Sequence, residues 1–144
     1  MKTITNTFRV AINAKPEAVF AYVSDLSRHG EWNDGLKVEA VTPGEPGVGS
    51  QYHSWGKPAH LLNEVTITDY QPPTRFAFVA RQAGFNEVRH EFVVHPQDGG
   101  TVLDRILTTK RPLLGRILIW PLIGRPAMNK CLAALKAKLE RPIA

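Results

Sequence analysis

Hydrophobic positions near the C-terminus recur with the period of a helix. Between Pro126 and Glu140 the apolar side chains occupy one face at the i, i+3, i+4, i+7 and i+11 positions, and asparagine, lysine and glutamate occupy the other. The preceding run, 112–123, is almost entirely Leu, Ile and Trp, and Pro121 and Pro126 each remove a backbone N–H donor. The sequence therefore predicts a long helix over 110–140 that is kinked or broken near these prolines. Its apolar face consists of Met128, Cys131, Leu132, Leu135 and Leu139.

Before this helix, the pattern predicts one strand, two short helices and six further strands. The run from Thr3 to Ile12 alternates in part and favours a strand. Pro16 suits the first turn of a helix, and Asp25 suits the cap of a second, shorter one that ends near Trp32. The later strands are predicted over 36–42, 51–55, 62–70, 75–81, 87–95 and 101–109, with short turns rich in glycine and proline between them. Neighbours joined by such short turns are expected to pair antiparallel.

The order of the predicted elements is typical of the α+β class, and composition supports one globular domain over 1–144. The chain has 144 residues, 43% of them hydrophobic and 22% charged, which is enough to bury a core. A single cysteine excludes an internal disulfide, and we expect a cytoplasmic protein without a signal peptide. The net charge is +5, but the basic residues are scattered and form no nucleic-acid-binding motif, so we expect no nucleic-acid partner.

Several short motifs, taken in order, resemble those of the START-like or Bet v 1-like (SRPBCC) superfamily, in its bacterial polyketide cyclase/dehydrase and lipid-transport branch. They cover the chain from about Ile4 to Leu139. The resemblance implies a helix-grip fold, in which a curved seven-stranded antiparallel sheet wraps around the long C-terminal helix and leaves an elongated pocket between them. The motifs are 14–20 leading to Asp25, Trp32, 47–50, 64–78 and 99–101.

Alternation along two neighbouring strands predicts the apolar floor of that pocket. Phe76, Phe78 and Ala80 share one face of the first strand. One face of the second strand carries Val88, His90, Phe92 and Val94. In the resembling family the region of Trp32 lines the pocket entrance, although this ring could equally pack the small helices onto the sheet. Three residues of the C-terminal helix could form the back wall or belong to ordinary core: Leu118, Trp120 and Met128.

For two strands, the pattern does not decide which face points into the pocket. On 51–55, either Trp55 with His53 or Tyr52 with Ser54 faces inwards, and we favour Trp55 because a large ring gains more from burial. On 101–109, either the Val102, Asp104, Ile106 face or the Leu103, Arg105, Leu107 face is acceptable, and the first would bury a carboxylate near His90. Arg81 and Arg89 could anchor an acidic ligand group or simply lie at solvated sheet edges.

Three functions compete at this point. The preferred one is binding or transport of a hydrophobic small molecule, such as a lipid, a polyketide or an aromatic metabolite, without a cofactor. The second is a cyclase- or aromatase-type enzyme, in which His53, His90 or Asp104 transfers a proton. The third is a membrane-surface or partner-binding module that uses 113–123 and its flanking Lys110, Arg111, Arg116 and Arg125. We expect no metal site, because His90 and His95 would point to opposite faces of a strand, and a monomer or homodimer.

Overall fold

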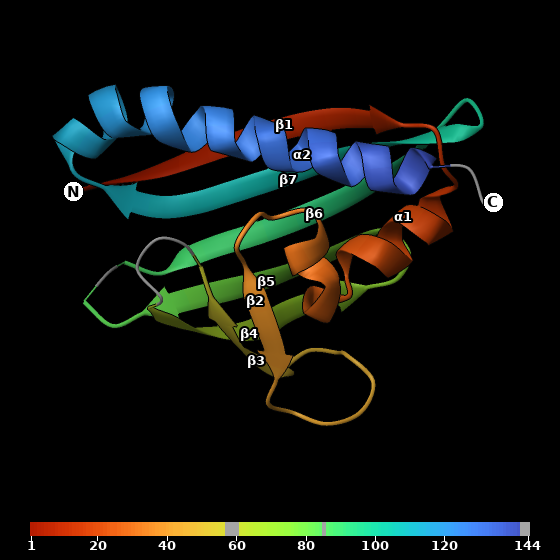
Figure 1. The fold of residues 1–144 in the computed structure, drawn as a ribbon, viewed down its shortest axis with the longest axis horizontal. Helices are drawn as coiled ribbons and strands as arrows, with labels where there is room; N and C mark the ends of the chain where they lie inside the picture. The colour runs from red at the N-terminus through yellow and green to blue at the C-terminus, as the bar shows by residue number, and fades with distance from the viewer. Residues whose placement is uncertain (57–60, 85, 142–144) are drawn as a thin grey trace.

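The computed structural model describes residues 1–56, 61–84 and 86–141. Seven strands form one antiparallel sheet in the order β1-β7-β6-β5-β4-β3-β2 (Figure 1). This confirms the predicted α+β helix-grip architecture. In chain order the elements are β1 (Lys2–Ile12), α1 (Pro16–Val23), η1 (Leu26–Glu31), β2 (Lys37–Ala40), β3 (Gln51–Trp55), β4 (Leu62–Gln71), β5 (Arg75–Gln82), β6 (Val88–Gln97), β7 (Gly100–Arg111), η2 (Gly115–Gly124) and α2 (Arg125–Glu140).

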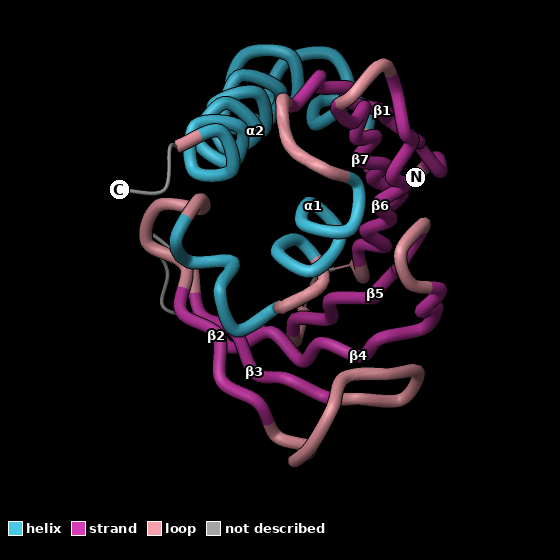
Figure 2. Tube along the Cα trace, turned by 90° about the vertical axis from the view of Figure 1, so that its right-hand side faces the viewer, coloured by secondary structure: helices cyan, strands magenta, loops and turns pink. Residues whose placement is uncertain are grey.

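The two small helices begin where the sequence predicts. Pro16 occupies the first turn of α1, where its missing N–H costs nothing, and the helix buries Val19, Phe20 and Val23. An Oδ1 atom of Asp25 accepts the backbone N–H of Ser27 at 3.2 Å and caps η1, which is a single 3-10 segment. Both helices lie inside the curve of the sheet (Figure 2), where they cover part of its concave face.

Cross-strand neighbours divide the concave face into rows, because residues directly opposite each other in an antiparallel sheet point to the same side. One row is fully packed: Phe8, Arg105, Phe92 and Phe76 lie side by side across β1, β7, β6 and β5. The rings of Phe76 and Phe92 stack with centroids 4.9 Å apart, and Phe20 of α1 meets Phe76 edge-on at 6.1 Å. The core is therefore centred under α1.

The C-terminal helix is not broken at its prolines, which corrects the sequence prediction. Residues 115–124 form a π-helix that continues directly into α2, and the backbone N–H of Arg125 bonds to the carbonyl of Trp120 in the wider register. A wider turn tolerates Pro121 inside the helix because the ladder of backbone hydrogen bonds is already displaced there. In α2 the predicted apolar face is confirmed: Leu132 and Leu135 are buried, and Met128, Cys131 and Leu139 pack against the core.

Trp120 is the main contact between η2 and the sheet. Its ring meets Phe8 of β1 edge-on at 5.9 Å, and the Arg111 guanidinium lies 4.1 Å from the ring centroid. A Cβ atom at Gly124 would clash with Cε3 of this ring and would lie 2.7 Å from Cζ3. Glycine at position 124 therefore makes room for the indole.

Gly124→Ala should lower the free energy of unfolding by about 1–3 kcal/mol, because the added methyl group overpacks against a buried ring. Helix propensity alone would change stability in the opposite direction by up to about 1 kcal/mol. Chemical denaturation measures the difference, with Gly47→Ala as the control, since a Cβ at Gly47 meets nothing within 4 Å. A Gly124→Ala protein as stable as the wild type would show that Trp120 is not held in this position.

Candidate functional site

A partly open cavity of about 630 Å³ lies between the sheet and η2. Its walls are mainly apolar, and the polar groups lie at its inner end and around its rim. Five strands, the chain before β2 and the start of the C-terminal helix contribute to it. The lining residues are Leu36, Ser54, Asn63, Val65, Phe78, Ala80, Gln82, Asn86, Val88, His90, Thr109, Lys110, Arg111, Pro112, Gly115 and Ile119.

The cavity exists because the helices cover only part of the concave face. The row of Val65, Ala80, Val88 and Thr109 lies two rows away from the packed Phe76–Phe92 row, beyond the reach of α1. Above it stands η2, which contributes only the small residue Gly115 and the partly outward-facing Ile119. A glycine and one side chain cannot fill the width of a curved sheet, so space remains.

His90 sits at the inner end of the cavity, in the row between the hollow and the packed core. Its ring stacks on Phe78 with centroids 4.6 Å apart. Behind it, Nη2 of Arg105 donates to Nδ1 of His90 at 3.3 Å, which leaves the proton of the neutral imidazole on Nε2. Burial, followed by the positive charge of Arg105 and the proximity of His29, lowers the pKa of His90 well below its usual value. His90 is therefore a neutral ring with one N–H to offer.

Arg105 is a buried cation that has no counter-ion within the described part of the chain. Its exposed fraction is 4%, and its Nε and Nη1 have no hydrogen-bond partner among the described residues. The guanidinium lies 5.3 Å from the centroid of Trp32 and 5.2 Å from that of Phe92, so two aromatic faces provide its closest stabilisation. Burial lowers its pKa to about 10. Nε1 of Trp32 also lacks a partner within the described residues, so unpaired donors gather behind His90.

His29 is a second buried histidine, and sequence reasoning did not single it out as a site residue. Its Nε2–H donates to the carbonyl of Val23 at 2.7 Å, and its ring packs on Trp32 with centroids 4.8 Å apart. Burial lowers its pKa to about 4. Because this hydrogen bond lies within one helix–loop unit, His29 supports the position of Trp32 and does not line the cavity.

The predicted orientation of β3 is wrong. Tyr52 and Ser54 are buried on the concave side, and Ser54 lines the cavity, whereas Trp55 and His53 lie half-buried on the outer face. The cause is the pairing with β4, which places Tyr52 opposite the inward-facing Val65. Trp55 instead packs edge-on against His53 and lies under the ammonium group of Lys37.

On β7 the second of the two open alternatives is correct. Leu103, Arg105 and Leu107 face inwards, and Asp104 is buried on the opposite face. The Asp104 carboxylate accepts hydrogen bonds from Arg9 at 2.7 Å and 2.9 Å and pairs with Nε2 of His95 at 3.0 Å. Hydrogen bonds from Arg9 hold its pKa below the usual value, even though burial opposes this. An acid–base pair of Asp104 with His90 is therefore not formed.

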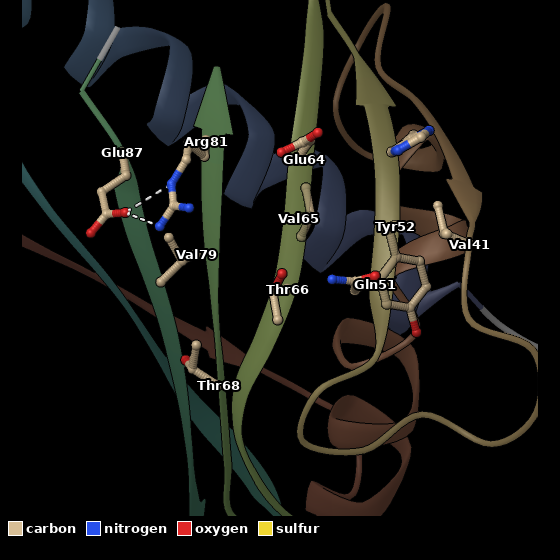
Figure 3. Close-up of a pocket in the computed structure, with 11 residues that line it drawn as sticks. Val41, Gln51, Tyr52, Glu64, Val65, Thr66, Thr68, Val79, Arg81 and Glu87 are labelled. Atoms are coloured by element: carbon tan, nitrogen blue, oxygen red, sulfur yellow. Dashed lines mark hydrogen bonds and ion pairs between the residues drawn. The ribbon is translucent and has the colours of Figure 1, made fainter. Parts of the chain in front are cut away.

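A second hollow of about 390 Å³ lies on the outer face of β3, β4 and β5 (Figure 3). It is lined largely by polar side chains such as Gln51, Glu64 and Thr66. Arg81 is already paired there with Glu87 at 2.7 Å, and Arg89, on the same face, bonds to Glu91 at 3.3 Å. Neither arginine reaches the cavity under η2, so neither lies where it could anchor a ligand bound there.

The remaining predicted site residues separate into three groups. Phe78 lines the cavity, whereas Phe76, Phe92 and Trp32 belong to the packed core beside it. Trp120 and Met128 pack against that core, and Leu118 is 48% exposed. Ala80 and Val88, which the sequence placed on the apolar floor, also line the cavity. Thr109 was not proposed from sequence, although it continues the alternation of Leu103, Arg105 and Leu107.

A sequence model of the family described as polyketide cyclase/dehydrase and lipid transport matches residues 2–140. The chain belongs to this family. Among solved structures, the chain resembles MLL2253 from Mesorhizobium loti with a TM-score of 0.75 and 17% identity, covering 98% of this chain and 100% of the other. No curated protein matches the chain.

Two further structures share the fold. Protein CV1439 from Chromobacterium violaceum aligns with a TM-score of 0.72 and 15% identity, over 96% of this chain and 99% of its own. Ara h 8.0201 aligns with a TM-score of 0.72 and 14% identity, over 96% and 98%. In the described ranges of this family member, no helix is both long and apolar enough to cross a membrane, and no three His, Cys, Asp or Glu side chains gather as metal ligands.

The free energy of unfolding should fall as the pH decreases from about 7 to about 4. In this window the unfolded chain protonates His29 near its ordinary pKa, whereas the folded chain does so only at about 4, so the unfolded state binds more protons. For His29 the loss should reach about 3 kcal/mol and then level off below the folded-state pKa. His90 adds to the same trend.

Urea unfolding across this range measures the effect, and NMR titration of His29 follows its pKa directly. Protonation of carboxylates such as Asp104 also lowers the free energy of unfolding on acidification. The test is therefore the comparison with His29→Gln, whose free energy of unfolding should depend less steeply on pH than that of the wild type. His53→Gln replaces a half-exposed histidine and serves as the control. Equal slopes for the wild type and His29→Gln would contradict the buried, neutral state of His29.

Arg105→Met should raise the free energy of unfolding by about 1–3 kcal/mol, because it replaces an unpaired buried cation with an apolar side chain of similar length. It should also raise the pKa of His90, since the charge of Arg105 helps to depress it. Thermal denaturation and NMR titration of His90 measure these two effects. A less stable variant with an unchanged His90 would show that Arg105 has a partner in solution and does not act on His90.

Proposed function

We propose that this protein binds and carries a hydrophobic small molecule, such as a lipid, a polyketide or an aromatic metabolite, in the cavity under η2. The observation that supports this is the cavity itself: about 630 Å³, walled by Val65, Phe78, Ala80 and Val88, with few polar groups. Small-molecule sites are typically about 300–1,000 Å³, mostly apolar, with a small number of placed donors and acceptors. The family's description as polyketide cyclase/dehydrase and lipid transport supports the same ligand class.

The polar groups of the cavity favour a ligand that carries oxygen acceptors. His90 offers a neutral N–H at the inner end, suited to a carbonyl, hydroxyl or carboxylate oxygen. Arg111 lines the cavity from the same side of β7 as Thr109, and none of the described lining residues is Asp or Glu. An acidic or strongly polar end of the ligand is therefore accommodated best near Arg111, with the apolar part along β5 and β6.

The geometry gives less support to a cyclase- or aromatase-type reaction. That function requires an acid and a base that converge on the substrate. Of the three proposed catalytic residues, His90 alone lines the cavity, while His53 and Asp104 lie on the outer face. Proton transfer by His90 would have to use an acidic or basic group of the substrate as its counterpart, so carriage is the function that the site supports best.

Ala80→Phe should raise the dissociation constant of an apolar probe at least about tenfold, because the ring occupies the middle of the cavity. Fluorescence titration with anilinonaphthalene sulfonate measures this. The matched control is Val79→Phe, which adds a ring one residue away on the outer face of the same strand. Similar probe binding by both folded variants would place the ligand elsewhere, and native mass spectrometry of the protein purified from cells would then show whether any ligand is retained.

A further inference from the structure

The start of the C-terminal helix exposes an unusual concentration of large apolar side chains. Among the described residues twelve large hydrophobic side chains are exposed, and seven of them lie within this one segment. Their exposed fractions run from 48% to 67%. Contiguous apolar surface of this kind is uncommon on monomers and marks contact sites. We call these seven residues the apolar stripe: Leu113, Leu114, Ile117, Leu118, Ile119, Leu122 and Ile123.

The charge around the apolar stripe has one sign. From Lys110 to Leu139 the chain contains seven lysines and arginines and no aspartate or glutamate. Lys110 and Arg111 precede the stripe, Arg116 lies within it, and Arg125 follows it. The surface thus combines a row of aliphatic side chains with flanking cations, which is the pattern of helices that lie in the interface of a lipid bilayer.

We propose that the apolar stripe docks on an anionic lipid bilayer. Anionic headgroups complement the basic flanks, and each lysine or arginine near such a surface contributes about 1 kcal/mol of attraction. A second copy of this chain is a poorer occupant, because pairing two stripes would bring cations of the same sign together without a carboxylate from either segment. The bilayer therefore satisfies both the apolar and the charged part of the surface.

The stripe adjoins the candidate ligand cavity. Ile119 belongs to both, and Arg111, Pro112 and Gly115 line the cavity from the same segment. Docking through the stripe would place Arg111 beside the lipid headgroups and the cavity next to the membrane. Exchange of a hydrophobic ligand directly with the bilayer then follows, and this second step, unlike the docking, rests on the proposed function.

The test is co-sedimentation of the full chain with vesicles of phosphatidylcholine and phosphatidylglycerol, compared with vesicles of phosphatidylcholine alone. Binding should be stronger to the anionic vesicles and should fall at about 1 M salt, where charges are screened within about 3 Å. The double variant Ile117→Ser with Ile123→Ser should lower the partition coefficient at least about tenfold, because two exposed side chains no longer enter the interface. Val48→Ser, at a 69% exposed site far along the chain, is the matched control.

Three results would overturn the proposal. They are the absence of binding to anionic vesicles, unchanged binding of the double variant, and a homodimer that the double variant dissociates, since a dimer would mean that a second copy covers the stripe. Ala80→Phe separates docking from the proposed function. It should weaken probe binding at least about tenfold and leave vesicle binding intact, whereas the double variant of the stripe should do the reverse.

Discussion

The contact between Trp120 and Phe8 holds the first half of the C-terminal helix at the β1 edge of the sheet. It is one large ring, seated where Gly124 provides room and Arg111 covers its face. The neighbouring Leu and Ile side chains make no comparable contact and remain exposed. Because only Gly115 and Trp120 of η2 are buried, this half of the helix is held mainly near one edge and spans the concave face without filling it. The cavity and the exposed apolar stripe are both consequences of that attachment.

Arg105 marks the boundary between the packed and the hollow halves of the concave face. A buried guanidinium without a carboxylate is unfavourable, and stacking near Trp32 and Phe92 offsets only part of the cost. An apolar residue would serve the core better. What the arginine provides is a fixed tautomer of His90 and a positive potential behind the cavity. Proteins tolerate such local departures from good packing mainly where a site requires them.

Periodicity predicted most of the fold because burial of apolar faces dictates it, as the α2 face with Leu132 and Leu135 shows. Periodicity gave the wrong orientation, or none, where the inward face of a strand depends on residues of other strands. Trp55 and Tyr52 are both large rings, and the choice between them follows from pairing with Val65, a residue on another strand. Asp104 faces outwards, where its carboxylate accepts hydrogen bonds from Arg9 and His95 on two different strands. The π-helix was not predicted, because a proline normally indicates a break in a helix. The local sequence does not show that the backbone hydrogen bonds adopt the wider π-helical pattern.

By composition alone, the Leu- and Ile-rich run of 113–123 would be assigned to the core. The structure has no core for it to join, because α1 and α2 already cover the packed row and only Gly115 and Trp120 of η2 are buried. Exposed aliphatic side chains lower the solubility of a protein, so a contiguous apolar surface in contact with water is unfavourable. An anionic lipid bilayer would remove these side chains from water, and its headgroups would complement the surrounding arginines and lysines. A hydrophobic ligand would also reside in such a bilayer, and the stripe adjoins the cavity through Ile119.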